Sequence, residues 1–147
     1  MMPRNPYLVA GGWLSLAASL LHIGCIVGGP DWYRFFGAGE ELATMAEQGS
    51  LVPAAITFAI AVVLAIWAAY AFAGTGRIRR LPLMRTALVA ITTIYLLRGL
   101  MIVPLQIQPR ATTFDHVSSL VVLIYGLFYL IGTWRAWPSL SRKESLV

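Results

Sequence analysis

The chain has 147 residues, of which 59% are hydrophobic and 12% are charged, and its mean hydropathy is +0.75. An ordinary soluble domain carries about 25% charged residues, so this composition excludes a soluble globular protein. The formal net charge is +5, but the basic residues lie between apolar segments. That placement indicates membrane topology and excludes nucleic acid as a partner. The single cysteine, Cys25, excludes an intramolecular disulfide and a zinc site with paired cysteines.

Four apolar segments are long enough to cross a bilayer, which takes about 20 helical residues. They comprise residues 8–28, 51–73, 84–104 and 116–134. The hydrocarbon core offers no water to backbone groups, so each segment must be a helix, and its length excludes the alternating strands of a barrel. The sequence therefore predicts an all-α fold, in which residues 1–147 form a single integral membrane four-helix bundle.

The first apolar segment, residues 8–28, contains one ionisable side chain, His22. An apolar segment near the N-terminus is also typical of a secretory signal, but His22 stands where a lipoprotein signal needs an apolar residue before Cys25. We therefore expect a membrane helix that stays in the protein. Gly24 and Gly28 have the four-residue spacing that allows a close helix contact.

A long connection, residues 29–50, follows this helix. Its first part, residues 30–36, is rich in aromatic side chains, and its second part, residues 40–48, begins with Glu40 and Glu41. Long ordered loops are often functional, so we predict two short interfacial helices that form a lid over the outer mouth of the bundle. A connector that is only anchored at the membrane surface is the alternative.

A short basic turn, residues 74–82, joins the second and third predicted helices. It opens with glycine and closes with proline, residues that end a helix and limit the following connection. A turn this tight predicts that the two helices are antiparallel neighbours.

Two ionisable side chains lie within the predicted helices at the same depth. His22 and Arg98 each precede the outer end of their helix by six residues, which is about 9 Å at 1.5 Å per residue. Charged groups at membrane depth are costly and mark functional sites. We predict that Arg98 points into the bundle, toward a partner or a ligand, rather than toward water.

Polar side chains on neighbouring turns predict a site around Arg98 in the outer half of the bundle. Tyr95 lies one turn before Arg98, and Ser119 follows Asp115 by one turn on the fourth helix. Asp115, on the fourth helix, is the nearest acid that could pair with Arg98, and Glu40 and Glu41 of the lid are the alternative partners. Capping of the fourth helix explains Asp115 as well, and small-residue packing explains the serines. The candidate ligand-binding residues are Arg98, His22, Tyr95, Asp115, Ser119, Glu40 and Glu41, of which His22 and Arg98 are also the catalytic candidates.

Metal and haem sites are poorer interpretations of the same residues. His22, His116 and the acids are ligand types that divalent ions accept, but no ligand spacing supports a metal site. A haem held by both histidines requires them at one level, whereas His22 lies about two turns deep and His116 at the boundary. We therefore predict no metal and no cofactor.

Basic residues are distributed unequally over the two sides of the predicted bundle. Eight lie on the side of both termini, and Arg34 and Arg110 lie on the other. Short loops rich in positive charge stay in the cytoplasm. This distribution predicts that both termini are cytoplasmic and that the lid is external.

Four short motifs resemble a group of small proteobacterial inner-membrane proteins. They are LLHIG at 20–24, DWYRFFGAG at 31–39, AYAF at 69–72 and YLLRG at 95–99. Together they cover the first three helices. The resemblance implies a multi-pass protein of the bacterial inner membrane.

The topology is more distantly similar to that of the EXPERA-type proteins, which include sterol isomerases and sigma-2 receptors. The shared features are four helices with both ends inside, a long first outer loop and the Tyr70-Ala71-Phe72 step before the basic turn. That family uses acidic and histidine residues in an intramembrane cavity to protonate or bind amphiphilic cations. Because the deep charge here is the basic Arg98, the resemblance transfers no catalytic residue to this chain.

Functions from different classes stay open at this point. One is a protein that binds a lipid-like or other amphiphilic molecule in an outward-opening pocket, where Arg98 holds an anionic or carbonyl group and His22 exchanges a proton. Another is a structural or accessory subunit of a larger membrane complex, in which Arg98 ties helices together and the lid docks a partner. An EXPERA-like isomerase is the third. The partner expected in every case is the lipid bilayer.

The charge distribution generates a direct test of orientation. We expect a reporter fused after Val147 to behave as cytoplasmic and the same reporter inserted after Gln48 to behave as external, measured with paired fluorescent and phosphatase fusions. An external C-terminus would contradict both the orientation and the number of membrane helices.

Overall fold

A computed structural model describes residues 5–105, 108 and 112–140, which form seven helices and no strand. Four spans are long and apolar enough to cross a membrane, which confirms the predicted all-helical membrane architecture. The long helices are α1 (Pro6–Gly28), α4 (Val52–Gly74), α5 (Met84–Leu100) and α7 (Thr113–Leu140), and α5 continues into the short α6 (Ile102–Leu105). Four basic residues used to predict orientation lie outside the described residues: Arg4, Arg110, Arg142 and Lys143.

The third span breaks near its end, where the sequence predicted one continuous helix over residues 84–104. Helix α5 ends at Leu100, and Met101 separates it from α6. Pro104 explains the break, because a proline nitrogen carries no hydrogen for the carbonyl of Leu100.

The last helix begins earlier than predicted, at Thr113 rather than at residue 116. The Asp115 carboxylate accepts hydrogen bonds from the backbone nitrogen and the hydroxyl of Thr112, both at 2.8 Å. The Thr112 hydroxyl in turn accepts one from the backbone nitrogen of Asp115 at 3.2 Å. This reciprocal capping satisfies donors that a helix start leaves without partners.

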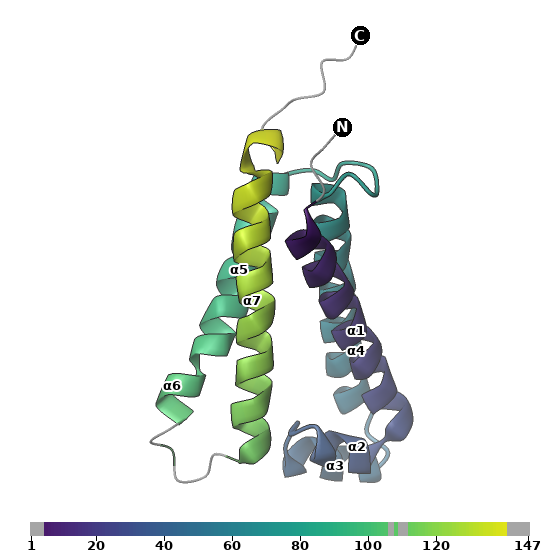
Figure 1. The fold of residues 1–147 in the computed structure, drawn as a ribbon. Coiled ribbons are helices and arrows are strands. Elements are labelled where there is room, and N and C mark those ends of the chain that lie inside the picture. The colour runs from purple at the N-terminus through teal and green to yellow at the C-terminus, as the bar shows by residue number, and fades with distance from the viewer. Residues whose placement is uncertain (1–4, 106–107, 109–111, 141–147) are drawn as a thin grey trace.

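The four long helices pack as two pairs. Helix α1 lies along α4 and α5 lies along α7, while α1 and α7 meet between the pairs (Figure 1). Helices α5 and α7 approach so closely that only glycine, which has no side chain, fits at two positions. A Cβ atom on Gly99 would lie 2.5 Å from the Cα of Leu123, and one on Gly126 would lie 2.8 Å from the Cδ2 of Leu96. Both distances are too short for a side chain, so glycine sets the separation of this pair.

One buried polar cluster connects all four long helices. We call it the serine–tyrosine cluster: Ser15 of α1, Trp67 of α4, Tyr95 of α5 and Tyr129 of α7. The Ser15 hydroxyl lies 2.8 Å from the Tyr95 hydroxyl and 2.9 Å from the Tyr129 hydroxyl. Tyr129 donates to the Trp67 carbonyl at 3.0 Å. The Tyr95 ring also packs against the rings of Trp67 and Tyr129, with centroids 4.8 and 5.3 Å apart.

The hydrogen bonds that join the two pairs lie in one half of the bundle. Near the start of α1, Asn5 Nδ2 donates to the Gly132 carbonyl of α7 at 2.7 Å. Within the described residues, the other hydrogen bonds between the pairs belong to the serine–tyrosine cluster. At the opposite end, α7 contacts the connection 29–50 through the ring of Phe114, which lies 6.3 Å from the ring of Phe36. The level of Arg98 therefore lies between two regions of contact.

Residues 29–50 contain two short helices, α2 (Pro30–Phe35) and α3 (Glu40–Glu47), as the sequence predicted. They lie across the end of the bundle that is opposite to both termini (Figure 1). Gly24 and Gly28 of α1 do make a close contact, but it is with the indole of Trp32 of α2 and not with a second long helix. The absence of side chains at these two glycines thus lets Trp32 of the lid pack directly against α1.

Replacing Ser15 with alanine tests the serine–tyrosine cluster. The substitution leaves the Tyr95 hydroxyl without its acceptor in a buried site, which costs about 1 to 3 kcal/mol. We expect the free energy of unfolding in detergent to fall by that amount, as measured by denaturant titration. The matched control is Thr93→Ala, which removes an exposed hydroxyl from α5. Equal stability of the two variants would contradict a structural role for the cluster.

Candidate functional site

Two of the predicted site residues meet on the α5–α7 pair. Arg98 lies at the end of α5, and its Nη1 donates to the Ser119 hydroxyl of α7 at 3.0 Å. Ser119 is completely buried, whereas the Arg98 side chain is accessible at the protein surface. The close approach of the two helices at Gly99, next to Arg98, brings the guanidinium and the hydroxyl within reach.

Arg98 makes no ion pair in the part of the chain that the structure describes, although the Asp115 carboxylate is near enough to interact with its charge. The ion pairs found there all involve Arg34. Asp115 lies one turn before Ser119, but its carboxylate caps α7 through Thr112, which was the alternative explanation for this residue. A guanidinium carries five N–H donors, so one neutral hydroxyl leaves most of them available to a ligand.

His22 lies on α1, in the other helix pair, and is half-buried. Its Nδ1 is 2.7 Å from the Ala18 carbonyl. A carbonyl can only accept, so Nδ1 carries a proton and donates this hydrogen bond. Among the described residues, His22 makes no hydrogen bond with Arg98 or Ser119. His22 therefore does not form part of the Arg98–Ser119 contact.

Tyr95 is placed differently from the sequence-based expectation. Its hydroxyl binds Ser15 inside the bundle, although the residue lies one helical turn before Arg98. The spacing of Tyr95 and Arg98 along one helix did not reveal which hydroxyl Tyr95 pairs with. Tyr95 therefore belongs to the serine–tyrosine cluster, and its ring contacts Tyr125 at a centroid distance of 5.7 Å.

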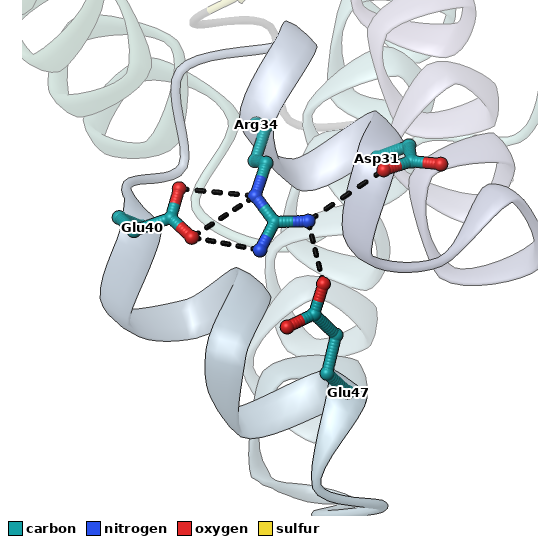
Figure 2. Close-up of polar contacts among 4 residues, drawn as sticks. All are labelled: Asp31, Arg34, Glu40 and Glu47. Atoms are coloured by element: carbon teal, nitrogen blue, oxygen red, sulfur yellow. Dashed lines mark hydrogen bonds and ion pairs between the residues drawn. The ribbon is translucent and has the colours of Figure 1, made fainter.

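The acids of the lid are organised around Arg34 rather than Arg98. Figure 2 shows the Arg34 guanidinium between three carboxylates. Its Nη2 donates to Glu40 at 2.7 Å and its Nη1 to Glu47 at 2.7 Å, while Asp31 lies 3.5 Å away. These contacts connect α2 to α3. In the sequence Arg34 served only as a topology marker, and its short separation from the acids was the signal that could have revealed this network.

Charge pairing in the lid shifts two pKa values in opposite directions. Hydrogen bonds from Arg34 lower the pKa of the Glu40 carboxyl, and hydrogen bonds to Glu40 and Glu47 raise the pKa of Arg34. Glu41 is exposed on the same helix. Arg34 and Glu40 are therefore both ionised at neutral pH. Arg34, the only arginine of the lid, is bound by acids of the lid itself.

A small buried cluster lies under the lid. Cys25 of α1, Tyr33 of α2 and Ala43 of α3 pack together, with Phe36 at its edge. The Tyr33 hydroxyl is buried and makes no hydrogen bond with a described residue. Within the described ranges, no three His, Cys, Asp or Glu side chains gather into a group that could hold a metal ion.

No protein-family model matches the chain, and no match was found among curated proteins or solved structures. The resemblances to small proteobacterial inner-membrane proteins and to EXPERA-type proteins therefore stay predictions. The groups that meet here are an accessible guanidinium and a buried hydroxyl that accepts one of its hydrogen bonds. The remaining N–H donors of a guanidinium are of the type that anionic or carbonyl oxygens accept from.

The pKa of Glu40 gives a test of the lid network. Because this pKa is lower in the folded protein than in the unfolded chain, the ion pair stabilises the lid above the unfolded-chain pKa, and that stabilisation is lost as the pH falls through the folded-state value. In Arg34→Gln, we expect the Glu40 carboxyl to titrate at higher pH than in the wild type. Carboxyl NMR titration in detergent micelles measures this. Identical titration curves would contradict the network.

Proposed function

We propose that this chain is a multi-pass protein of the bacterial inner membrane that binds a lipid-like amphiphile, with both termini in the cytoplasm and the lid outside. In this proposal the anionic or carbonyl headgroup of the amphiphile lies against Arg98. The apolar tail lies along the neighbouring apolar side chains of α5 and α7, among them Leu97 and Leu120, which are exposed.

The observation that carries the proposal is that the Arg98 guanidinium makes no ion pair with a described carboxylate. The residue lies within the candidate span Met84–Pro104, and its hydrogen-bond partner is the neutral hydroxyl of Ser119. An unneutralised guanidinium at membrane depth costs several kcal/mol. A carboxylate or phosphate satisfies the planar N–H fork with two parallel hydrogen bonds, and it neutralises the charge at the same time.

The position of Arg98 also suits a ligand that arrives through the membrane. The side chain is accessible at the protein surface, so an amphiphile can reach it without opening the bundle. On one side of this level the two helix pairs are joined by the serine–tyrosine cluster, and on the other side α7 contacts the lid through Phe114 and Phe36. In the proposed complex, the ligand lies between these two contacts, beneath the lid.

Exchange of Arg98 for methionine tests the proposal, because methionine keeps the length and removes the charge. A hydrogen bond to a charged group contributes about 1.5 to 3 kcal/mol, so its loss weakens binding of the amphiphile roughly ten- to hundredfold and lowers the amount that stays bound during purification. We expect wild-type protein purified in mild detergent to carry an acidic amphiphile that Arg98→Met lacks, as measured by mass spectrometry of the extracted lipid. The matched control is Val89→Met, which introduces the same side chain at an exposed position of α5 away from the proposed ligand.

Other outcomes of this experiment would support a different function or contradict the proposal. If Arg98→Met keeps its lipid but loses a co-purifying membrane protein, Arg98 pairs with a carboxylate of a partner, and the accessory-subunit function replaces the proposed one. If both lipid and partners are unchanged, Arg98 contacts only bulk headgroups and the proposal is wrong. Should Arg98→Met fail to fold, Ser119→Ala keeps the charge but removes the hydroxyl that orients it, and we expect a partial loss of the bound amphiphile.

A further inference from the structure

The end of the bundle at which α1 begins and α7 ends is basic. The cationic side chains described there are Arg77, Arg79, Arg80, Arg85 and Arg135. The acids among the described residues lie in the lid or at the start of α7, which is the opposite end (Figure 1). The ion pairs of the described residues all involve Arg34, so no described carboxylate neutralises this basic end.

Two of these arginines bind the end of α7. Arg85 Nη2 donates to the Trp137 carbonyl at 3.1 Å, and its guanidinium lies 4.5 Å from the centroid of the Trp137 ring. Arg80 Nη2 donates to the Ser139 carbonyl at 3.0 Å. The last carbonyls of a helix lack partners and carry partial negative charge, so both contacts stabilise the C-terminal turns of α7.

Arg135 is held in another way. Its guanidinium lies 4.6 Å from the centroid of the Tyr7 ring, on α1. Stacking occupies the face of the guanidinium plane and leaves the N–H donors at its edge unused. Arg135 is exposed and makes no hydrogen bond with a described residue, and the same is true of the Arg77 and Arg79 side chains in the turn after α4. Three guanidiniums thus offer free donors on this end.

The depth of Arg135 matches that of lipid headgroups. Trp134 precedes it and Trp137 follows it on α7, and both indoles are exposed. Exposed tryptophans concentrate at the membrane–water interface, at the level of the headgroups. The free edge of the Arg135 guanidinium therefore lies where lipid phosphates lie.

We propose that this end of the protein binds the phosphate of anionic phospholipids, with Arg135 as the docking side chain and with Arg77 and Arg79 adding charge. The planar fork of a guanidinium matches two phosphate oxygens. Tyr7 orients the fork, and the net positive charge of this end selects an anionic lipid over a zwitterionic one. The site is separate from the Arg98 site, which lies toward the other end of the bundle, and it does not depend on the proposed function.

Native mass spectrometry of the full chain in detergent, titrated with phosphatidylglycerol or phosphatidylcholine, tests this inference. We expect the wild type to prefer phosphatidylglycerol. Each arginine near a membrane surface contributes about fivefold to the affinity for an anionic lipid, so Arg135→Gln is expected to weaken phosphatidylglycerol binding about fivefold. Phosphatidylcholine binding is expected to stay unchanged. Arg135→Lys, the matched control, keeps the charge and most of the preference.

Two further variants keep the test decisive. The double substitution Arg77→Gln and Arg79→Gln affects exposed side chains without hydrogen bonds to described residues, so it leaves the fold intact, and we expect it to reduce the preference as well. To separate the two sites, the arginine variants of the basic end are also titrated in the Arg98→Gln background, which removes the guanidinium of the other proposed anion site. A wild-type preference in Arg135→Gln would overturn the inference. Loss of the preference in Arg98→Gln with no further loss on adding Arg135→Gln would also overturn it, and would instead support the Arg98 site. Displacement of the lipid by equimolar inorganic phosphate would likewise overturn it, because the site would then bind a free anion.

Discussion

The arrangement of the bundle depends on a directional chain of hydrogen bonds through its interior. Each hydroxyl has one proton, and Tyr129 gives its proton to the Trp67 carbonyl. Ser15 must then donate to Tyr129, and Tyr95 must donate to Ser15. The membrane interior contains no water that could replace any of these partners. Four helices are therefore fixed in rotation and register by one continuous set of donors and acceptors.

This constraint determines where the candidate site lies. The chain of hydrogen bonds through Ser15 and the Asn5–Gly132 contact hold the two helix pairs together in the half where α1 begins and α7 ends. In the other half, the α5–α7 pair is held by its own glycine contacts, and it reaches the lid through Phe114. Arg98 lies in this second half, where the hydrogen bonds described above do not connect its helix pair to α1 and α4. The site can therefore bind a molecule without disturbing the hydrogen bonds that define the fold.

Length and hydropathy were enough to predict the four membrane helices and the two short helices of the lid, because the bilayer allows few alternatives. The partners of Gly24, Arg34 and Arg98 were not predictable in the same way. The long helices are apolar on all sides, so no amphipathic face indicates which direction a given side chain points. Asp115 shows the contrast, since capping acts within a few residues of the chain and could be anticipated from the Thr112–Asp115 spacing.

Three arginines of this chain, whose net charge is +5, have different surroundings. Three of its six acids surround the single guanidinium of Arg34. Arg135 rests on an aromatic ring and Arg98 on a neutral hydroxyl, and neither contact cancels charge. Four of the six acids lie in the lid, and neither Arg98 nor Arg135 makes an ion pair with a described carboxylate, which supports the two proposed anion sites. In a membrane, the anions that reach such positions belong to amphiphiles, since only their headgroups come with a tail that the apolar helices can accept.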